Sequence, residues 1–173
     1  MNALDPIALR FASDEQILKE CRWEAFRASG PGGQKRNKTS SAIRLVHVPS
    51  GLAAIANESR SQAANRKVAL RRLRHRKMVE LRAVIEPETF VPPEWFTHLC
   101  PKGRLEVPER GEFYLAAAGL VLDVLASRAW SVSEAAVMLG LSTGNLVRFL
   151  QRDEKVMAQV NAMRVRGGFK PLG

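Results

Sequence analysis

The alternation of apolar and polar residues predicts a small sheet in the first part of the chain. Residues 22–27 and 41–47 alternate in the way that strands with one buried face do. Residues 49–51, Pro-Ser-Gly, have the composition of a turn, and residues 52–56 are a short apolar run. The pattern therefore predicts a strand, a polar loop and then a β-hairpin.

The same pattern predicts two helices next to these strands in the sequence. Ser13 and Gln16 form a capping box at the start of a short helix. A long helix is expected from Ser61 to about Val84, with an apolar stripe for packing on the sheet and a largely basic remaining surface. Its stripe consists of Ala63, Leu70, Leu73, Leu81 and Val84. The fold class expected for residues 1–85 is α+β, a small mixed sheet with a glycine-rich loop and a long basic helix.

The rest of the chain divides into a linker and a helical module. Residues 86–110 contain five of the nine prolines, which favour stiff extended chain, and Trp95, Phe96 and Leu99 are expected to pack onto a domain. Residues 111–173 read as a separate all-α module that ends in a basic tail, expected to be mobile.

Part of this module resembles a helix-turn-helix. Residues 131–134 have the sequence of a capping box, and Gly140 separates a first helix of small residues from a second helix. The second helix is a candidate for binding nucleic acid, and a small helical bundle used for docking is the open alternative. Its candidate contact residues are Ser142, Thr143, Asn145, Arg148 and Arg152.

The distribution of charge along the chain indicates the kind of partner that the protein binds. The net charge is +10, and residues 22–82 hold 15 Lys or Arg against 3 Asp or Glu. Such a local excess favours a polyanionic partner, RNA or DNA, over a basic face without a partner. Two cysteines and three scattered histidines give no disulfide framework and no metal site. No apolar run reaches membrane-spanning length, so we expect a cytoplasmic protein without a membrane partner.

The predicted loop after the first strand is Ser29-Gly30-Pro31-Gly32-Gly33-Gln34-Lys35-Arg36-Asn37-Lys38-Thr39. Adjacent glycines give the backbone freedom and allow its close approach to a ligand, while the polar and basic residues keep the loop in solvent. An ordinary glycine-rich hairpin is the alternative for the loop alone. The residues around it, together with residues 47–51 and 58–66, resemble in order and spacing the catalytic domain of class I peptide chain release factors. The short ribosome-rescue hydrolases of the ArfB type share this resemblance, which covers roughly residues 17–80.

The resemblance implies hydrolysis of the peptidyl-tRNA ester in the ribosomal peptidyl transferase centre, with Gly32, Gly33 and Gln34 as the catalytic motif. The backbone amide at Gln34 would stabilise the oxyanion and its side chain would shape the pocket for water. No cofactor, metal or small-molecule substrate is expected. Many family members have His-Val after the glutamine, whereas this chain has Lys35-Arg36.

The resemblance and the charge together nominate residues that would hold RNA phosphates near the loop or along the long helix. These residues are Lys35, Arg36, Asn37, Lys38, Arg60, Arg66, Lys67, Arg71 and Arg74.

Because no segment matches the codon-reading domains of full release factors, we expect codon-independent release on stalled ribosomes by a monomer. The helical module would be an anchor of a different kind from the ArfB tail. The alternatives are a non-catalytic RNA- or DNA-binding regulator and a ribosome-binding homologue without catalysis.

Overall fold

The computed structural model describes residues 11–26, 41–108 and 112–173. Within these ranges the helices and strands are α2 (Asp14–Lys19), β1 (Cys21–Phe26), β2 (Ala42–His47), β3 (Ala53–Ala56), α3 (Gln62–Glu80), α4 (Glu94–His98), the 3₁₀ turn η1 (Pro101–Gly103), α5 (Glu112–Ser127), α6 (Val132–Leu139), α7 (Thr143–Leu150) and α8 (Glu154–Arg166). The chain forms two compact units, Met1–Lys77 and Met78–Gly173, each with its own hydrophobic core. The predicted domain and linker boundaries stay predictions. No helix among the described residues combines the length and apolar character that crossing a membrane requires.

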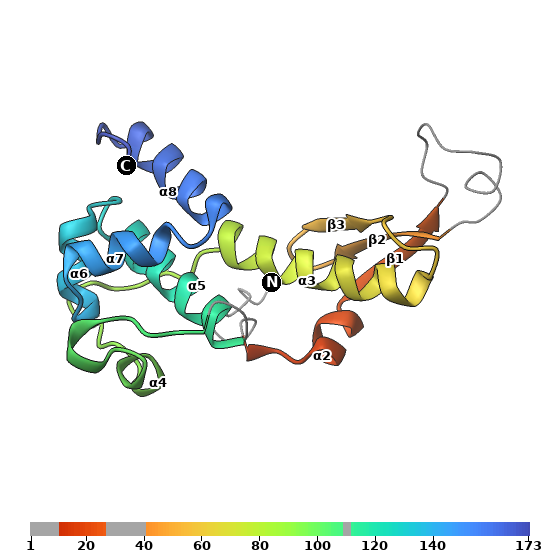
Figure 1. Cartoon of the computed structure of the whole chain (residues 1–173), viewed down its shortest axis with the longest axis horizontal. Coiled ribbons are helices and arrows are strands. Elements are labelled where there is room, and N and C mark those ends of the chain that lie inside the picture. The colour runs from red at the N-terminus through yellow and green to blue at the C-terminus, as the bar shows by residue number, and fades with distance from the viewer. Residues whose placement is uncertain (1–10, 27–40, 109–111) are drawn as a thin grey trace. The chain divides into compact units, whose positions relative to one another are not determined.

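The sheet of the first unit has three strands in the order β1-β2-β3 (Figure 1). β1 pairs with β2 and β2 pairs with β3, both antiparallel, and the last pair of the first ladder is Phe26 with Ala42. The predicted strands and hairpin are confirmed, as is the α+β class. The mixed sheet was a wrong expectation for the described residues, because strands that are neighbours in sequence pair here in antiparallel order.

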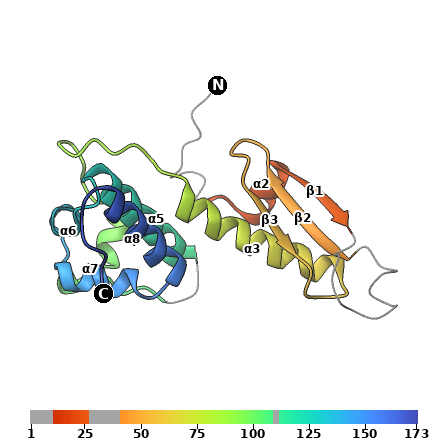
Figure 2. The same cartoon turned by 90° about the horizontal axis from the view of Figure 1, so that it is seen from above.

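Helix α3 lies along one face of this sheet (Figures 1 and 2). Leu70 and Leu73 of the helix are buried in one cluster with Leu45 of β2. The helix ends at Glu80 rather than near Val84, which is 90% exposed. The backbone N–H of Ala83 instead donates to the buried carboxylate of Asp123 at 3.0 Å, so the chain leaves the helical path there.

The short helix α2 completes the first unit. Ser13 and Gln16 form the predicted capping box, with each side chain accepting a hydrogen bond from the other residue's backbone N–H. Arg74 of α3 holds this segment, since its guanidinium contacts the carboxylate of Asp14 at 2.8 Å and donates to the carbonyl of Ala12 at 2.6 Å. The helix is thereby tied to α3 at its beginning.

Residues 86–108 of the predicted linker contribute side chains to the core of the second unit. Phe96 is fully buried, and Trp95 and Leu99 pack against the same cluster, which confirms their predicted packing. The stiff extended chain expected here is interrupted by α4, which begins directly after Pro93, because proline is tolerated at the start of a helix. Leu105 and Val107 are buried in this cluster as well.

Helices α6 and α7 are joined by a short turn. Gly140 has a φ of 68°, and the N–H groups of Gly140 and Leu141 bond to carbonyls of α6, which ends the helix as a left-handed C-cap. The predicted capping box at Ser131 does not form, since the Ser131 hydroxyl contacts that of Ser133 and caps no N–H. The helix-turn-helix interpretation of this pair stays a prediction.

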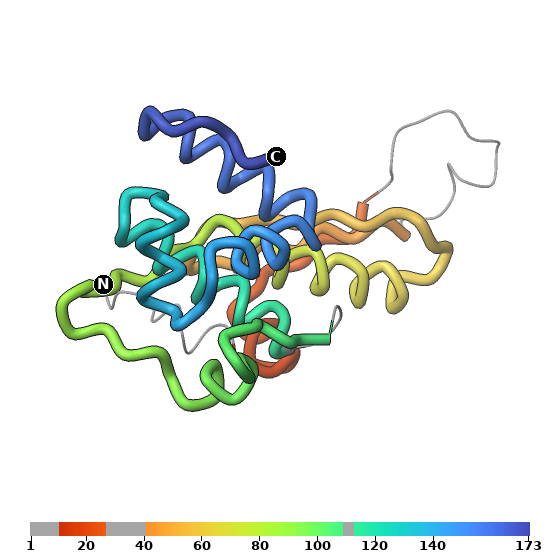
Figure 3. Tube along the Cα trace, turned by 60° about the vertical axis from the view of Figure 1, so that its left-hand side comes forward, coloured from red at the N-terminus to blue at the C-terminus, as the bar shows by residue number. Residues whose placement is uncertain are grey.

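The C-terminal residues turn back along α8 (Figure 3). Asn161 exchanges two hydrogen bonds with the backbone of Leu172, and Gln151 donates to the carbonyl of Gly173. Arg164 is 9% exposed and donates to the carbonyls of Trp130 and Lys170. The expectation of a mobile tail was wrong, because these side chains bind its backbone.

Candidate nucleic-acid interface

The predicted catalytic loop lies between two strands whose ends the structure defines. β1 ends at Phe26, β2 begins at Ala42, and these two residues are partners across the sheet. Gly32, Gly33 and Gln34 lie in residues 27–40, outside the described residues, as do the four candidate RNA ligands of residues 35–38. The two ends of this segment are therefore joined to paired residues of the sheet.

Asn65 of α3 secures the returning end of the segment. Its side-chain nitrogen donates to the carbonyl of Ser41 at 2.6 Å and to that of Ser59 at 2.8 Å, while its oxygen accepts from the N–H of Ser59 at 2.9 Å. Asn65 is fully buried, so these bonds satisfy backbone groups that would otherwise be costly to leave unpaired. The sequence pattern predicted no role for Asn65. Its spacing of four and eight residues from Ala69 and Leu73, which puts a polar amide on an apolar side of the helix, was the signal that could have revealed it.

The basic residues predicted to bind RNA on and near α3 have different surroundings. Arg60, Lys67 and Arg71 are exposed and leave their charges in solvent. Arg66 is half-buried. Arg74 is engaged with Asp14 and the carbonyl of Ala12, so the structure gives it a role in holding α2. The exposed cations remain suited to phosphate contacts.

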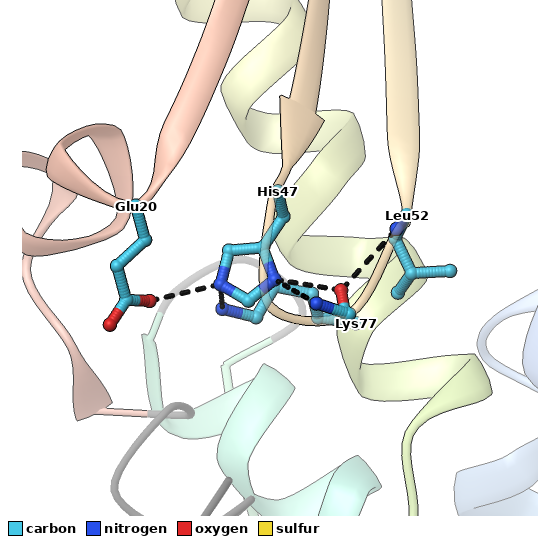
Figure 4. Close-up of polar contacts among 5 residues, drawn as sticks. Glu20, His47, Leu52 and Lys77 are labelled. Atoms are coloured by element: carbon cyan, nitrogen blue, oxygen red, sulfur yellow. Dashed lines mark hydrogen bonds and ion pairs between the residues drawn. The ribbon is translucent and has the colours of Figure 1, made fainter. Parts of the chain in front are cut away.

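His47, for which the sequence predicts no chemistry, is fully buried and is the centre of a polar cluster (Figure 4). Its Nε2 lies 2.9 Å from the carboxylate of Glu20 and 3.2 Å from the ammonium nitrogen of Lys77. Its Nδ1 lies 2.7 Å from the hydroxyl oxygen of Ser50. Lys77 is only 6% exposed, so its side chain is buried in the last turn of α3. The cluster connects α3 with the ends of α2 and β2.

The hydrogen bonds around His47 indicate which ring nitrogen of the neutral imidazole carries the proton. Nδ1 faces the backbone N–H of Ser50, and the Ser50 hydroxyl accepts from Leu52, which leaves that hydroxyl free to donate to Nδ1. Nε2 therefore carries the proton and donates to Glu20. Burial lowers the pKa of His47, the bond to Glu20 opposes this, and the charge of Lys77 lowers the pKa further. Burial also lowers the pKa of Lys77. This pattern fits a structural role, with the imidazole held inside the fold.

The candidate residues on and beside helix α7 of the second unit differ in their exposure and hydrogen bonds. Thr143 and Arg148 are exposed, and Ser142 is the N-cap whose hydroxyl accepts from the N–H of Asn145. The Asn145 side chain donates to the carbonyl of Gly103 at 3.1 Å, and Arg152 donates to that of Val107 at 2.9 Å. These two residues therefore fasten residues 103–107 onto α7 within this unit.

The part of the chain that the structure describes contains no cluster of side chains suited to a metal ion. No group of three or more His, Cys, Asp or Glu side chains there is arranged to hold a metal ion. Burial raises the pKa of the Cys100 thiol to about 11, so that thiol stays protonated at neutral pH.

Residues 15–88, which include all of α2 but its first residue, the sheet and α3, match the family described as the RF-1 domain. Over 57 residues the chain is 53% identical to peptide chain release factor 2 of Variovorax paradoxus (strain S110), covering 33% of this chain and 16% of that relative. Over 58 residues it is 52% identical to the mitochondrial peptide chain release factor 1 of Homo sapiens, covering 34% and 13% respectively. Over 61 residues it is 48% identical to a peptide chain release factor homolog of Escherichia coli, covering 35% and 30%. The chain thus spans less than a third of the length of each of these relatives.

Proposed function

We propose that the protein, whose residues 15–88 match the RF-1 domain, hydrolyses the ester of peptidyl-tRNA on the ribosome without requiring a stop codon. The observation that carries the proposal is the domain match, which encloses Gly32-Gly33-Gln34. The three relatives described above are two peptide chain release factors and a release factor homolog. The alternative is a homologue that binds RNA without catalysis.

The chemistry of the proposed reaction suits a loop of glycines and one amide. Water attacks the ester carbonyl carbon, a carbon–oxygen bond forms, and the bond to the ribose oxygen of the tRNA breaks. The ribose oxygen takes up a proton as it leaves, and the other product is the free peptide acid. Negative charge develops on the carbonyl oxygen, where a preorganised backbone N–H such as that at Gln34 is stabilising. Gly32 and Gly33 would let the backbone approach without a side-chain clash.

The described geometry around the loop supports precise placement of this motif. Phe26 and Ala42 close the sheet at its base, and Asn65 binds the carbonyl of Ser41 directly before β2. A reactive group held by rigid strands and a buried hydrogen-bond network keeps its position better than one on a free loop. Exposed Lys67 and Arg71 supply cations for RNA phosphates nearby on the same domain.

The helical module, residues 111–173, takes the role of an anchor in this proposal. It would hold the RF-1 domain on a stalled ribosome, with rRNA and peptidyl-tRNA as partners and one protein chain per ribosome. Thr143 and Arg148 on α7 are exposed and therefore open to a partner. The reaction needs no cofactor.

The test is release of a labelled peptide from purified ribosomes stalled at the end of an mRNA without a stop codon. Wild type is compared with Gly33→Ala and Gln34→Ala, and Gln159→Ala in α8 is the matched glutamine control. We expect release by wild type and by Gln159→Ala. Gly33→Ala, which disturbs the backbone that carries the oxyanion donor, is expected to slow release about 10²- to 10³-fold.

Ribosome binding measured in parallel separates the two functions. A hydrolase loses release in the loop variants and keeps binding. Tight binding by wild type without release would contradict the proposal and favour the non-catalytic homologue. Release only from ribosomes that display a stop codon would contradict codon independence alone.

A further inference from the structure

A groove of about 490 Å³ lies within the first unit, between α2, β1 and α3. Its apolar lining includes Leu18, Ile43 and Leu70. Trp23 also lines it, and the register pairs Trp23 with Leu45, which places both on the sheet face that α3 covers. Leu45 is fully buried, whereas Trp23 is 49% exposed. A large aromatic side chain on the core face of the edge strand is therefore open to solvent on one side of a groove.

Cationic side chains of α3 line the same groove. The guanidinium of Arg66 lies over the Trp23 ring, 5.4 Å from its centroid. The Nε of Arg66 is buried and has no hydrogen-bond partner among the described residues. Lys67 also lines the groove and is exposed. An unsatisfied buried donor is unusual in a folded protein and indicates a position where an acceptor belongs.

The acidic residue at the groove does not oppose an anion there. Asp14 lines the groove, but its carboxylate is paired with Arg74 at 2.8 Å. An aromatic face, a partly unsatisfied guanidinium and an exposed ammonium are groups that can stack a base and hold its phosphate. A base-paired nucleotide keeps its faces stacked inside the helix, so the occupant must be unpaired.

We infer that the groove between Trp23, Arg66 and Lys67 binds one unpaired RNA nucleotide, its base against the indole and its phosphate at the two cations. The inference rests on the RNA-binding part of the proposed function and adds a contact outside the catalytic motif. Trp23 lies in the strand that leads directly into the loop, so the bound nucleotide would neighbour the base of that loop. Trp23 thus gains a role that its alternation pattern did not suggest.

Binding of a fluorescent single-stranded RNA of mixed sequence to the full-length protein tests the stacking contact. Trp23→Ala is expected to raise the Kd about tenfold and Trp23→Phe about threefold, with no change for a fully paired RNA duplex. The matched control is Ile55→Ala, since Ile55 is 47% exposed but lies on the opposite sheet face. Its Kd should equal that of wild type.

Salt dependence separates stacking from charge. Trp23→Ala removes no cation, so the slope of log Kd against log salt should stay the same, whereas Arg66→Gln should reduce that slope by about 1. Photo-crosslinking of 5-iodouridine RNA to wild type provides a readout that does not depend on the folding of any variant. The crosslink is expected on the peptide that contains Trp23.

The inference is overturned if Trp23→Ala keeps the wild-type Kd for single-stranded RNA, or if crosslinks map only to other peptides. An equal loss of affinity for duplex and single strand would also overturn it, because that result indicates a general charge surface. These assays contain no ribosome. If wild type fails to release peptide but Trp23→Ala still raises the Kd for single-stranded RNA, only the hydrolase proposal is refuted.

Discussion

The amide nitrogen of Asn65 lies 2.6 Å from the carbonyl oxygen of Ser41, so helix α3 holds the residue at which the candidate catalytic segment rejoins the sheet. The same amide group also binds both backbone groups of Ser59, on the approach to α3. One buried side chain thereby fixes two connections of the first unit. It supplies the rigidity that a positioned loop needs.

Replacement of Asn65 by alanine is predicted to destabilise the first unit by about 3 kcal/mol, because three backbone groups lose their partner at once. Thermal denaturation and hydrogen exchange of β2 and α3 measure this loss. The matched control is Asn161→Ala, which removes two similar bonds to Leu172 in the second unit. Faster exchange of β2 in the control than in Asn65→Ala would contradict the assigned role.

Local patterns predicted most of the elements of the first unit, and contacts distant in sequence explain what they missed. Ser13 and Gln16 interact three residues apart, so the capping box could be read directly. Glu20 and Lys77, the charged partners of His47, are 27 and 30 residues away, and no periodicity encodes them. The loop motif was recognised by resemblance, since the geometry of Gly32 to Gln34 lies outside the described residues.

The sequence also does not distinguish cations that face a partner from cations that are bound within the fold. Composition predicts that a basic helix faces a polyanion, but it does not tell which cations are used inside the fold. Arg74 binds Asp14, and Lys77 is buried beside His47. Trp23 fits the strand pattern as an ordinary apolar member, and only the register and its exposure distinguish it.

Acid is predicted to destabilise the protein through His47. Because the folded protein lowers the pKa of His47 below its ordinary value of 6.5, the unfolded chain binds the proton more readily. Stability is therefore retained above that value and falls as the pH drops through it toward the folded pKa. The lowered pKa of Lys77 acts with the same sign, but in the alkaline range below 10.5. The measurement is the thermal midpoint of wild type and His47→Gln between about pH 8 and about pH 5.

His47→Gln is expected to lower the midpoint at neutral pH, since the bonds to Glu20 and Ser50 are disturbed, and to flatten its decline in acid. The control is His98→Gln, a histidine whose side chain is 74% exposed. This control should keep the wild-type pH profile. An unchanged acid decline in His47→Gln would show that other groups cause it.

Arg148 is predicted to separate the two interpretations of helix α7. Its side chain is exposed, whereas Asn145 and Arg152 bind the backbone of Gly103 and Val107. If α7 docks on rRNA, Arg148→Ala should weaken ribosome binding and reduce its salt slope by about 1, with stability changed by less than about 0.5 kcal/mol. Arg152→Ala should instead cost about 1–2 kcal/mol of stability, because it loses the bond to Val107 and its stacking on Phe149. Lys155→Ala, an exposed cation in the first turn of α8, controls for the loss of one positive charge. Equal ribosome affinity of Arg148→Ala, Lys155→Ala and wild type would contradict docking through α7 and assign the anchor to another face of the module.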